Sequence, residues 1–185
     1  NGVGSALKNA YAKSDGEIIG WLDADDFYCN STLNIISQYF DKFKKVKFIY
    51  GNCHIVDDQN KQIGDFIVDD FNKDIWLNVQ HYIIFAASFF KREVIQKCGF
   101  VNDLGNDLYF YLNVPKKFNM YKINENLSNW RLHSSSISLK PSKREMLIRR
   151  QRAKEDFWLV LKHGGSIFSP RSMTYFAVLE SIYSK

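Results

Sequence analysis

Short apolar segments bounded by polar turns recur along the chain and alternate with segments of helical spacing. The apolar runs at 18–22 and 82–90 are typical of buried strands. Residues 46–56 are rich in β-branched and aromatic residues and predict another strand, to which 62–68 returns after a turn at 57–61. Strands that alternate with helices in this way predict an α/β fold built around a sheet.

Helices are predicted where apolar residues recur three or four positions apart. Such segments are found at 6–12, 33–40, 91–99, 107–112 and, broken at Gly164, Gly165 and Pro170, from 142 onward. A short strand is predicted at 120–126, and a polar loop at 130–138.

Composition narrows the class of protein. The chain has 185 residues, enough for one domain with a sizeable core, and its hydrophobic content of 45% excludes a disordered chain. Its three cysteines are far apart and form no CxxC pair, which argues against a zinc ribbon and fits a reducing compartment. The longest apolar run is too short to cross a bilayer. We therefore expect a cytoplasmic protein, either free or bound at the inner face of the membrane. The net charge of +5 suits an anionic partner.

The strand predicted at 18–22 is followed by the carboxylates of Asp23, Asp25 and Asp26. In α/β sheets, ligands bind just beyond the carboxyl ends of the strands. Residues i and i+2 of an extended chain project to the same side, so we expect Asp23 and Asp25 to converge while Asp26 points away. Paired carboxylates favour a hard divalent cation such as Mg²⁺ or Mn²⁺. The alternative is a polar loop after a core strand.

The order of several motifs resembles that of the family 2 glycosyltransferases, which have the GT-A fold. The segment GEIIGWLDADDFY at 16–28 resembles the centre of that domain. Further segments follow in the family's order: FIYGN and VDDQNK within 48–61, ASFFKREV at 87–94, CGF at 98–100, ND at 106–107 and WRLHxxSxS at 130–138. The resemblance implies a Rossmann-like mixed sheet flanked by helices.

The resemblance also implies an activity, namely transfer of a sugar from a nucleotide-diphosphate sugar, with a UDP-sugar expected, to a hydroxyl group. The acceptor would be a glycan or lipid-linked molecule, the anomeric configuration would invert, and the product would belong to cell-surface glycan or polysaccharide synthesis. Asp23, Asp25 and His133 would bind a divalent cation, Mn²⁺ or Mg²⁺. Asp23 and Arg131 would contact the donor. Asp107 would be the general base that deprotonates the acceptor hydroxyl.

Each of these assignments has an alternative. Asp107 is placed to cap a helix, and Asp103 is a rival base four residues earlier. A hydrogen-bonded histidine in a polar loop is the alternative for His133, and pairing with a core carboxylate instead of a phosphate is the alternative for Arg131. Asn106 stands where the family carries Glu.

Members of the family begin with two further strand motifs that hold the nucleotide, and neither is present in the sequence. We therefore expect 1–138 to be the C-terminal part of a GT-A domain, truncated at its N-terminal side, and 139–185 to be a helical extension. A sheet without those strands exposes edges and apolar faces, so the chain alone is expected to be inactive. A non-catalytic sugar- or partner-binding fragment and a nucleotidyltransferase are the alternative classes.

Basic residues gather between 140 and 154, and an aromatic segment follows at 157–161. This pattern favours peripheral contact of residues 140–161 with an anionic membrane surface, near lipid-linked acceptors. A solvated helix that packs its apolar face on the domain is the alternative. No nucleic-acid recognition motif accompanies the charge, so no nucleic-acid partner is expected.

Overall fold

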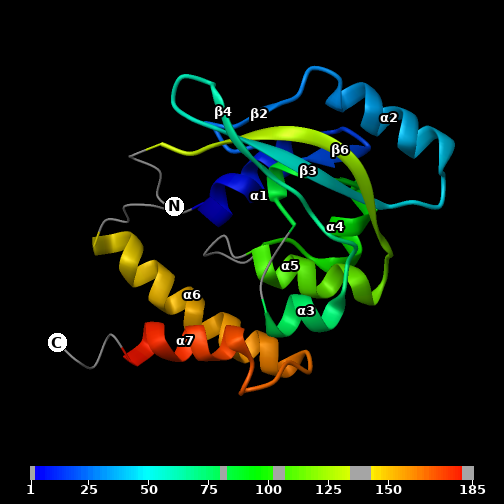
Figure 1. The fold of residues 1–185 in the computed structure, drawn as a ribbon. Helices are drawn as coiled ribbons and strands as arrows, with labels where there is room; N and C mark the ends of the chain where they lie inside the picture. Colours follow the sequence, from blue (N-terminus) through cyan, green and yellow to red (C-terminus); the bar gives the residue numbers. More distant parts are fainter. Residues whose placement is uncertain (1–2, 80–82, 102–106, 134–142, 181–185) are drawn as a thin grey trace.

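The computed structural model describes residues 3–79, 83–101, 107–133 and 143–180, and it shows a curled mixed sheet flanked by helices (Figure 1). The mixed α/β fold predicted from the sequence is confirmed. The strands are β1 (Ile18–Gly20), β2 (Phe27–Tyr28), β3 (Phe48–Val56), β4 (Gln62–Phe66), β5 (Ser88–Lys91) and β6 (Met120–Arg131). The α-helices are α1 (Val3–Lys13), α2 (Thr32–Lys42), α3 (Lys73–Asn78), α4 (Arg92–Cys98), α5 (Asp107–Asn113), α6 (Lys143–Lys162) and α7 (Pro170–Glu180). Two short 3-10 helices are η1 (Phe85–Ala87) and η2 (Val114–Lys116).

The long strand β3 is the centre of the sheet, whose strand order is β1-β5-β3-β6-β2, with β4 paired to β3. β3 runs parallel to β6 and antiparallel to β5 and β4. β1 pairs with β5, and β2 pairs with β6. The two strands on either side of the acidic segment therefore lie at opposite ends of the strand order, and the segment crosses between them.

Alternation of side chains along β3 builds one core on each face of the sheet. Phe48 and Tyr50 are fully buried in the core that α3, α4 and α5 cover. Ile49 and Cys53 point the other way, into the core that α2 covers with Ile36 and similar apolar residues. Figure 1 shows α2 on one side of the sheet and α3, α4 and α5 on the other.

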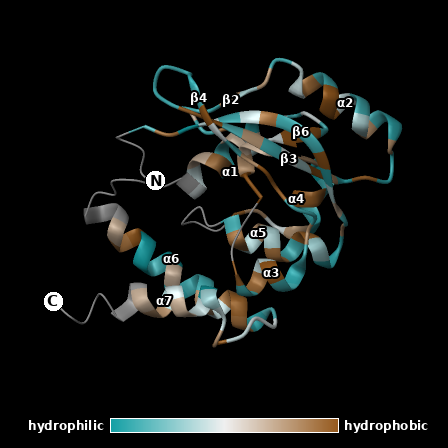
Figure 2. Cartoon of the chain, in the orientation of Figure 1, coloured by the Kyte–Doolittle hydropathy of each residue, from teal (hydrophilic) through white to brown (hydrophobic). Residues whose placement is uncertain are grey.

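The helices α6 and α7 pack on the first of these cores. Val160 of α6 is fully buried in it, and Leu159 and Tyr175 pack against it. Figure 2 shows polar and apolar residues interleaved along α6. Among the helices in the described part of the chain, none has the length and apolar character needed to cross a membrane. The division of the chain at residue 138 stays a prediction.

Two predicted elements differ from the structure. The run at 82–90 was predicted as one strand, but its described part first forms η1, because the hydroxyl of Ser88 donates to the carbonyl of Ile84 and closes a turn. The strand predicted at 120–126 continues to Arg131, because its last residues pair in parallel with the end of β3. The first two residues of the predicted polar loop are thus strand, and residues 134–138 of that loop lie outside the described residues.

Candidate active site

The acidic segment lies in a turn between β1 and β2. β1 already ends at Gly20, and the backbone N–H of Asp26 donates to the carbonyl of Asp23 over 3.2 Å. The expectation that Asp23 and Asp25 project to one side of a strand is wrong, because the chain has left the sheet before it reaches them. Asp23 and Asp25 are exposed, whereas Asp26 is half-buried.

His133 is the residue that the fold brings to this turn. Its Nε2 lies 3.1 Å from Oδ2 of Asp25, where 22% of the histidine side chain and 46% of the aspartate side chain are exposed. Oδ1 of Asp23 instead accepts a hydrogen bond from Nε1 of Trp21 at 3.4 Å. The structure thus joins Asp25 with His133 and gives Asp23 a different partner.

The donor atoms of Asp25 and His133 fit a cation that takes most of its ligands from water and substrate. Within the described ranges, no group of three or more Asp, Glu, His or Cys side chains is placed to hold a metal. Magnesium sites that act on phosphates commonly use only one or two carboxylates of the protein, and water and phosphate oxygens fill the other positions. A carboxylate and an imidazole, as found at Asp25 and His133, also suit Mn²⁺.

Arg131, at the end of β6, holds the acidic turn against the hairpin between β3 and β4. Its Nε donates to the carbonyl of Asp25 at 2.8 Å, and its backbone N–H donates to Oδ1 of Asp26 at 2.9 Å. Its Nη1 and Nη2 donate to the carbonyl of Asp57 at 3.0 Å and to Oδ1 of Asn60 at 2.7 Å. These hairpin contacts had no signal in the sequence, because Asp57 and Asn60 are 74 and 71 residues away. Contact of Arg131 with a donor phosphate stays a prediction.

Asp26 is turned toward the backbone of Arg131 and away from solvent. Burial raises the pKa of Asp26 to about 6, against the hydrogen bond from Arg131, and the charges of Asp25 and Asp23 add to the rise. The Asp26 carboxylate is thus the one that anchors the turn, while the more exposed carboxylates of Asp23 and Asp25 face outward.

Asp107 is the first residue of α5 and is half-buried. Its carboxylate accepts hydrogen bonds from its own backbone N–H and from that of Leu108. Burial raises the pKa of Asp107, the charge of Arg152 opposes the rise, and the charge of Asp23 adds to it. The rival base Asp103 lies outside the described residues.

Gly20 lets the strand after the turn pack closely over the strand before it. A Cβ atom at Gly20 would lie 2.6 Å from Cε1 of Phe89 and 2.6 Å from the hydroxyl oxygen of Tyr28. The Tyr28 hydroxyl donates to the carbonyl of Trp21 at 3.3 Å, and its ring lies 5.2 Å from that of Phe89. This close approach sets the path of residues 21–26.

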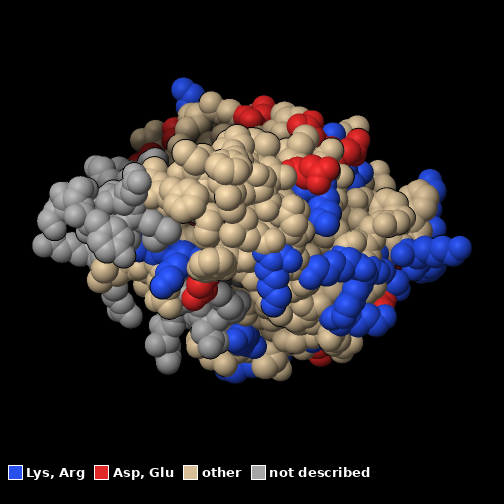
Figure 3. Space-filling view, turned by 90° about the horizontal axis from the view of Figure 1, so that it is seen from below, with Lys and Arg blue, Asp and Glu red and all other residues tan. Residues whose placement is uncertain are grey.

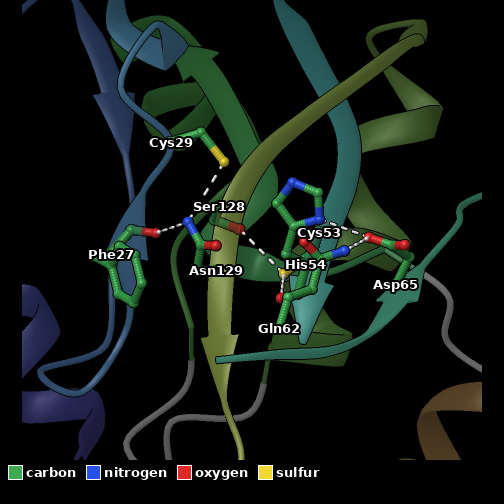
Figure 4. A network of polar contacts seen from close by, with 8 residues as sticks. All are labelled: Phe27, Cys29, Cys53, His54, Gln62, Asp65, Ser128 and Asn129. Carbon is green, nitrogen blue, oxygen red and sulfur yellow. Dashed lines mark hydrogen bonds and ion pairs between the residues drawn. The ribbon is translucent and has the colours of Figure 1, made fainter. Parts of the chain in front are cut away.

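Polar contacts along the sheet hold the end of the turn in place (Figure 4). Nδ2 of Asn129 donates to the carbonyl of Phe27 at 3.5 Å and to Sγ of Cys29 at 3.4 Å, which ties β2 to β6. Nδ1 of His54 lies 2.5 Å from Oδ1 of Asp65 and ties β3 to β4. The Asn129 contacts therefore hold β2, which follows the acidic turn, on β6, the strand that ends in Arg131.

The curled mixed sheet with its flanking helices also occurs in a solved structure of known type. The chain is similar to the crystal structure of S. aureus TarS, a glycosyltransferase, with a TM-score of 0.51 and 13% sequence identity. That match covers 83% of this chain and 27% of the TarS chain. The crystal structure of S. aureus TarS 1-349 matches with a TM-score of 0.49 and 11% identity, over 97% of this chain and 49% of that one.

The extent of these matches limits what they show. The chain spans less than half the length of either structure. At 13% identity, the similarity to the first structure shows the fold alone. No family model and no curated protein sequence matches the chain. The function therefore has to be argued from the site.

Proposed function

We propose that this chain is part of a metal-dependent glycosyltransferase of the family 2 type. The donor is a nucleotide-diphosphate sugar, a UDP-sugar in our proposal, and the acceptor is a hydroxyl group of a glycan or lipid-linked molecule in polysaccharide synthesis. The contact between Asp25 and His133, in a glycosyltransferase-like fold, is the observation that carries the proposal. Glycosyl transfer needs a group that neutralises a departing diphosphate and a group that accepts a proton, and candidates for both occur here.

Asp25 and His133 would hold Mn²⁺ or Mg²⁺, and Asp23 would serve as a further ligand or as a contact of the donor. When bound, the cation neutralises the charge that accumulates on the departing nucleoside diphosphate. Arg131 keeps the backbone of Asp25 in position through its Nε contact, and we propose that it also lies near the donor phosphates.

Asp107 is the proposed general base. The acceptor oxygen forms a bond to the anomeric carbon while the bond from that carbon to the diphosphate oxygen breaks, and the hydroxyl proton passes to the Asp107 carboxylate. A single in-line displacement of this kind inverts the anomeric configuration. Burial raises the pKa of Asp107, which makes its carboxylate a stronger base.

The activity is tested by incubating the protein with a UDP-sugar, Mn²⁺ and a hydroxyl acceptor and identifying the product that the donor releases. A glycosyltransferase releases UDP, whereas a nucleotidyltransferase releases pyrophosphate. Asp25→Asn and Asp107→Asn are each expected to lower the rate at least about a hundredfold with the fold intact. His54→Gln is the matched control, because His54 also pairs with an aspartate, but that pair joins β3 to β4. Turnover that survives both aspartate substitutions contradicts the proposal, and absence of any release favours a binding protein.

We also propose that α6 brings the protein to the inner face of a membrane. Leu147 and Trp158 are 63% and 61% exposed, and Lys154 lies between them on the same face of the helix. Exposed apolar and basic side chains on one helix face suit the boundary between water and anionic lipid.

A further inference from the structure

A cavity of about 320 Å³ lies among α3, the end of α5 with η2, and the last turn of α6. Its polar lining consists of Lys73, Lys116, Lys162 and His163, and its apolar lining includes Leu112 and Pro115. The described residues that line the cavity include no acidic residue and no residue of the proposed active site. Figure 3, a view from below, shows Lys and Arg side chains gathered on this side of the molecule.

The ammonium group of Lys116 is held by neutral acceptors. Its Nζ donates to Oδ1 of Asn113 at 3.0 Å and contacts Nε2 of His163 at 2.8 Å. Other lysines of the protein, Lys47 and Lys91 among them, pair with glutamates. Within the part of the chain that the structure describes, neither Lys73, Lys116 nor Lys162 forms an ion pair with a carboxylate. Within the described residues, the positive charge of these three lysines is therefore not neutralised by an ion pair.

His163 is arranged to support Lys116 as a neutral imidazole. Its Nδ1 lies 2.7 Å from the carbonyl of Leu159, which only an N–H donor satisfies, so Nε2 is left as an acceptor for the Lys116 ammonium. Burial lowers the pKa of His163, and the positive charges of Lys116, Lys162 and Lys73 lower it further. The histidine thus orients a lysine without neutralising it, and three lysines line one small space.

We propose that this cavity binds a small soluble organic phosphate. Its phosphate group would lie among Lys73, Lys116 and Lys162, and its carbon portion would pack on the apolar lining. A phosphate dianion offers three acceptor oxygens and two negative charges, which match three ammonium donors more closely than the two oxygens and single charge of a carboxylate. The volume of about 320 Å³ lies near the lower end of ordinary ligand pockets, which fits one phosphate and one ring.

Phenyl phosphate is a suitable probe, because it combines one phosphate with one ring. It is titrated into the protein in EDTA-containing buffer without donor, and binding is followed by calorimetry and by the imidazole NMR signals of His163. We expect saturable binding, with inorganic phosphate about tenfold weaker because it cannot use the apolar lining, and no binding of phenol. Lys116→Gln and Lys73→Gln are each expected to weaken phenyl phosphate binding about tenfold.

Lys117→Gln is the matched control, because Lys117 is adjacent to Lys116 but does not line the cavity, and its Nζ donates to the carbonyl of Lys97. Circular dichroism shows whether each variant is folded. The proposal is overturned by absence of binding at about 10 mM phenyl phosphate, or by equal weakening in Lys117→Gln and Lys116→Gln. It is also overturned if vesicles of phosphatidic acid bind through Lys116 while phenyl phosphate does not. The assay contains no sugar donor and no cation, so its outcome is independent of the proposed transferase activity.

Discussion

Nε2 of His133 lies 3.1 Å from Oδ2 of Asp25, although the two residues are 108 positions apart in the sequence. If this pair binds the cation, His133→Gln and Asp25→Asn will each weaken Mn²⁺ binding by about a hundredfold, since changes to outer-shell partners alone commonly cost 10–100-fold. Water-proton relaxation during a Mn²⁺ titration measures the affinity. His54→Gln should leave it unchanged, because the His54–Asp65 pair ties β3 to β4. Unchanged Mn²⁺ affinity in His133→Gln removes the histidine from the proposed site.

Arg131→Met removes the guanidinium that joins the acidic turn to the hairpin. The carbonyls of Asp25 and Asp57 lose a charge-assisted donor, so we expect the free energy of unfolding to fall by about 2–3 kcal/mol. Urea denaturation measures the change. Lys61→Met, in the same hairpin, serves as the control. Arg131→Lys is expected to recover little, because an ammonium cannot reproduce the planar fork. If Arg131→Met lowers the free energy of unfolding by less than about 0.5 kcal/mol, Arg131 does not hold the acidic turn on the hairpin.

Gly20→Ala tests the close packing that sets the path of the acidic turn. The new Cβ would meet Phe89 and Tyr28 at 2.6 Å, so we expect a loss of about 1–3 kcal/mol of stability. Gly64→Ala is the paired control, since the nearest atom to its Cβ would be Cδ1 of Ile55 at 3.7 Å, an ordinary contact. Thermal unfolding of both variants gives the comparison, and equal stability of the two would contradict the packing argument.

Arg152→Met tests whether α6 tunes the proposed base. Burial raises the pKa of Asp107 and the charge of Arg152 opposes that rise, so removing the charge raises the pKa further. Asp107 must be ionised to accept a proton, so activity appears as pH rises through its pKa, and the acid limb of kcat/KM should move to higher pH. Arg149→Met, an exposed change in the same helix, should leave the profile in place. An acid limb that stays fixed in Arg152→Met, or moves to lower pH, rules out this effect.

Trp158→Glu and reversal of charge at Arg150 and Lys154 test the proposed membrane contact. Each basic residue near an anionic surface contributes about 1 kcal/mol, so reversing two charges should lower co-sedimentation with anionic vesicles more than tenfold. Tyr121→Glu is a control, because Tyr121 is 43% exposed but lies on β6. Equal loss of binding in Tyr121→Glu, or binding that does not depend on anionic lipid, contradicts a contact through α6.

Sequence patterns predicted much of the local structure, because strands and helices follow from the spacing of neighbouring residues. The segments at 33–40, 62–68 and 91–99 lie close to α2, β4 and α4, and the breaks at Gly164 and Pro170 separate α6 from α7. The predictions were weaker where a distant strand decides the outcome. β6 runs on to Arg131 because β3 lies beside it, and no local pattern carries that information.

The sequence by itself determined which chemical groups are available: three carboxylates after a short strand, an arginine and a histidine near each other, and an aspartate at a helix start. Only the tertiary structure decided how they combine. In the folded chain, the acidic segment leaves the sheet at Gly20 and Asp25 contacts His133. The guanidinium of Arg131 joins the acidic turn to the hairpin between β3 and β4. It also assembled the lysine cavity from α3, η2 and α6. The reason is physical, since side-chain periodicity is a property of neighbouring residues, whereas these contacts depend on which strands pair and which helices pack across the sheet.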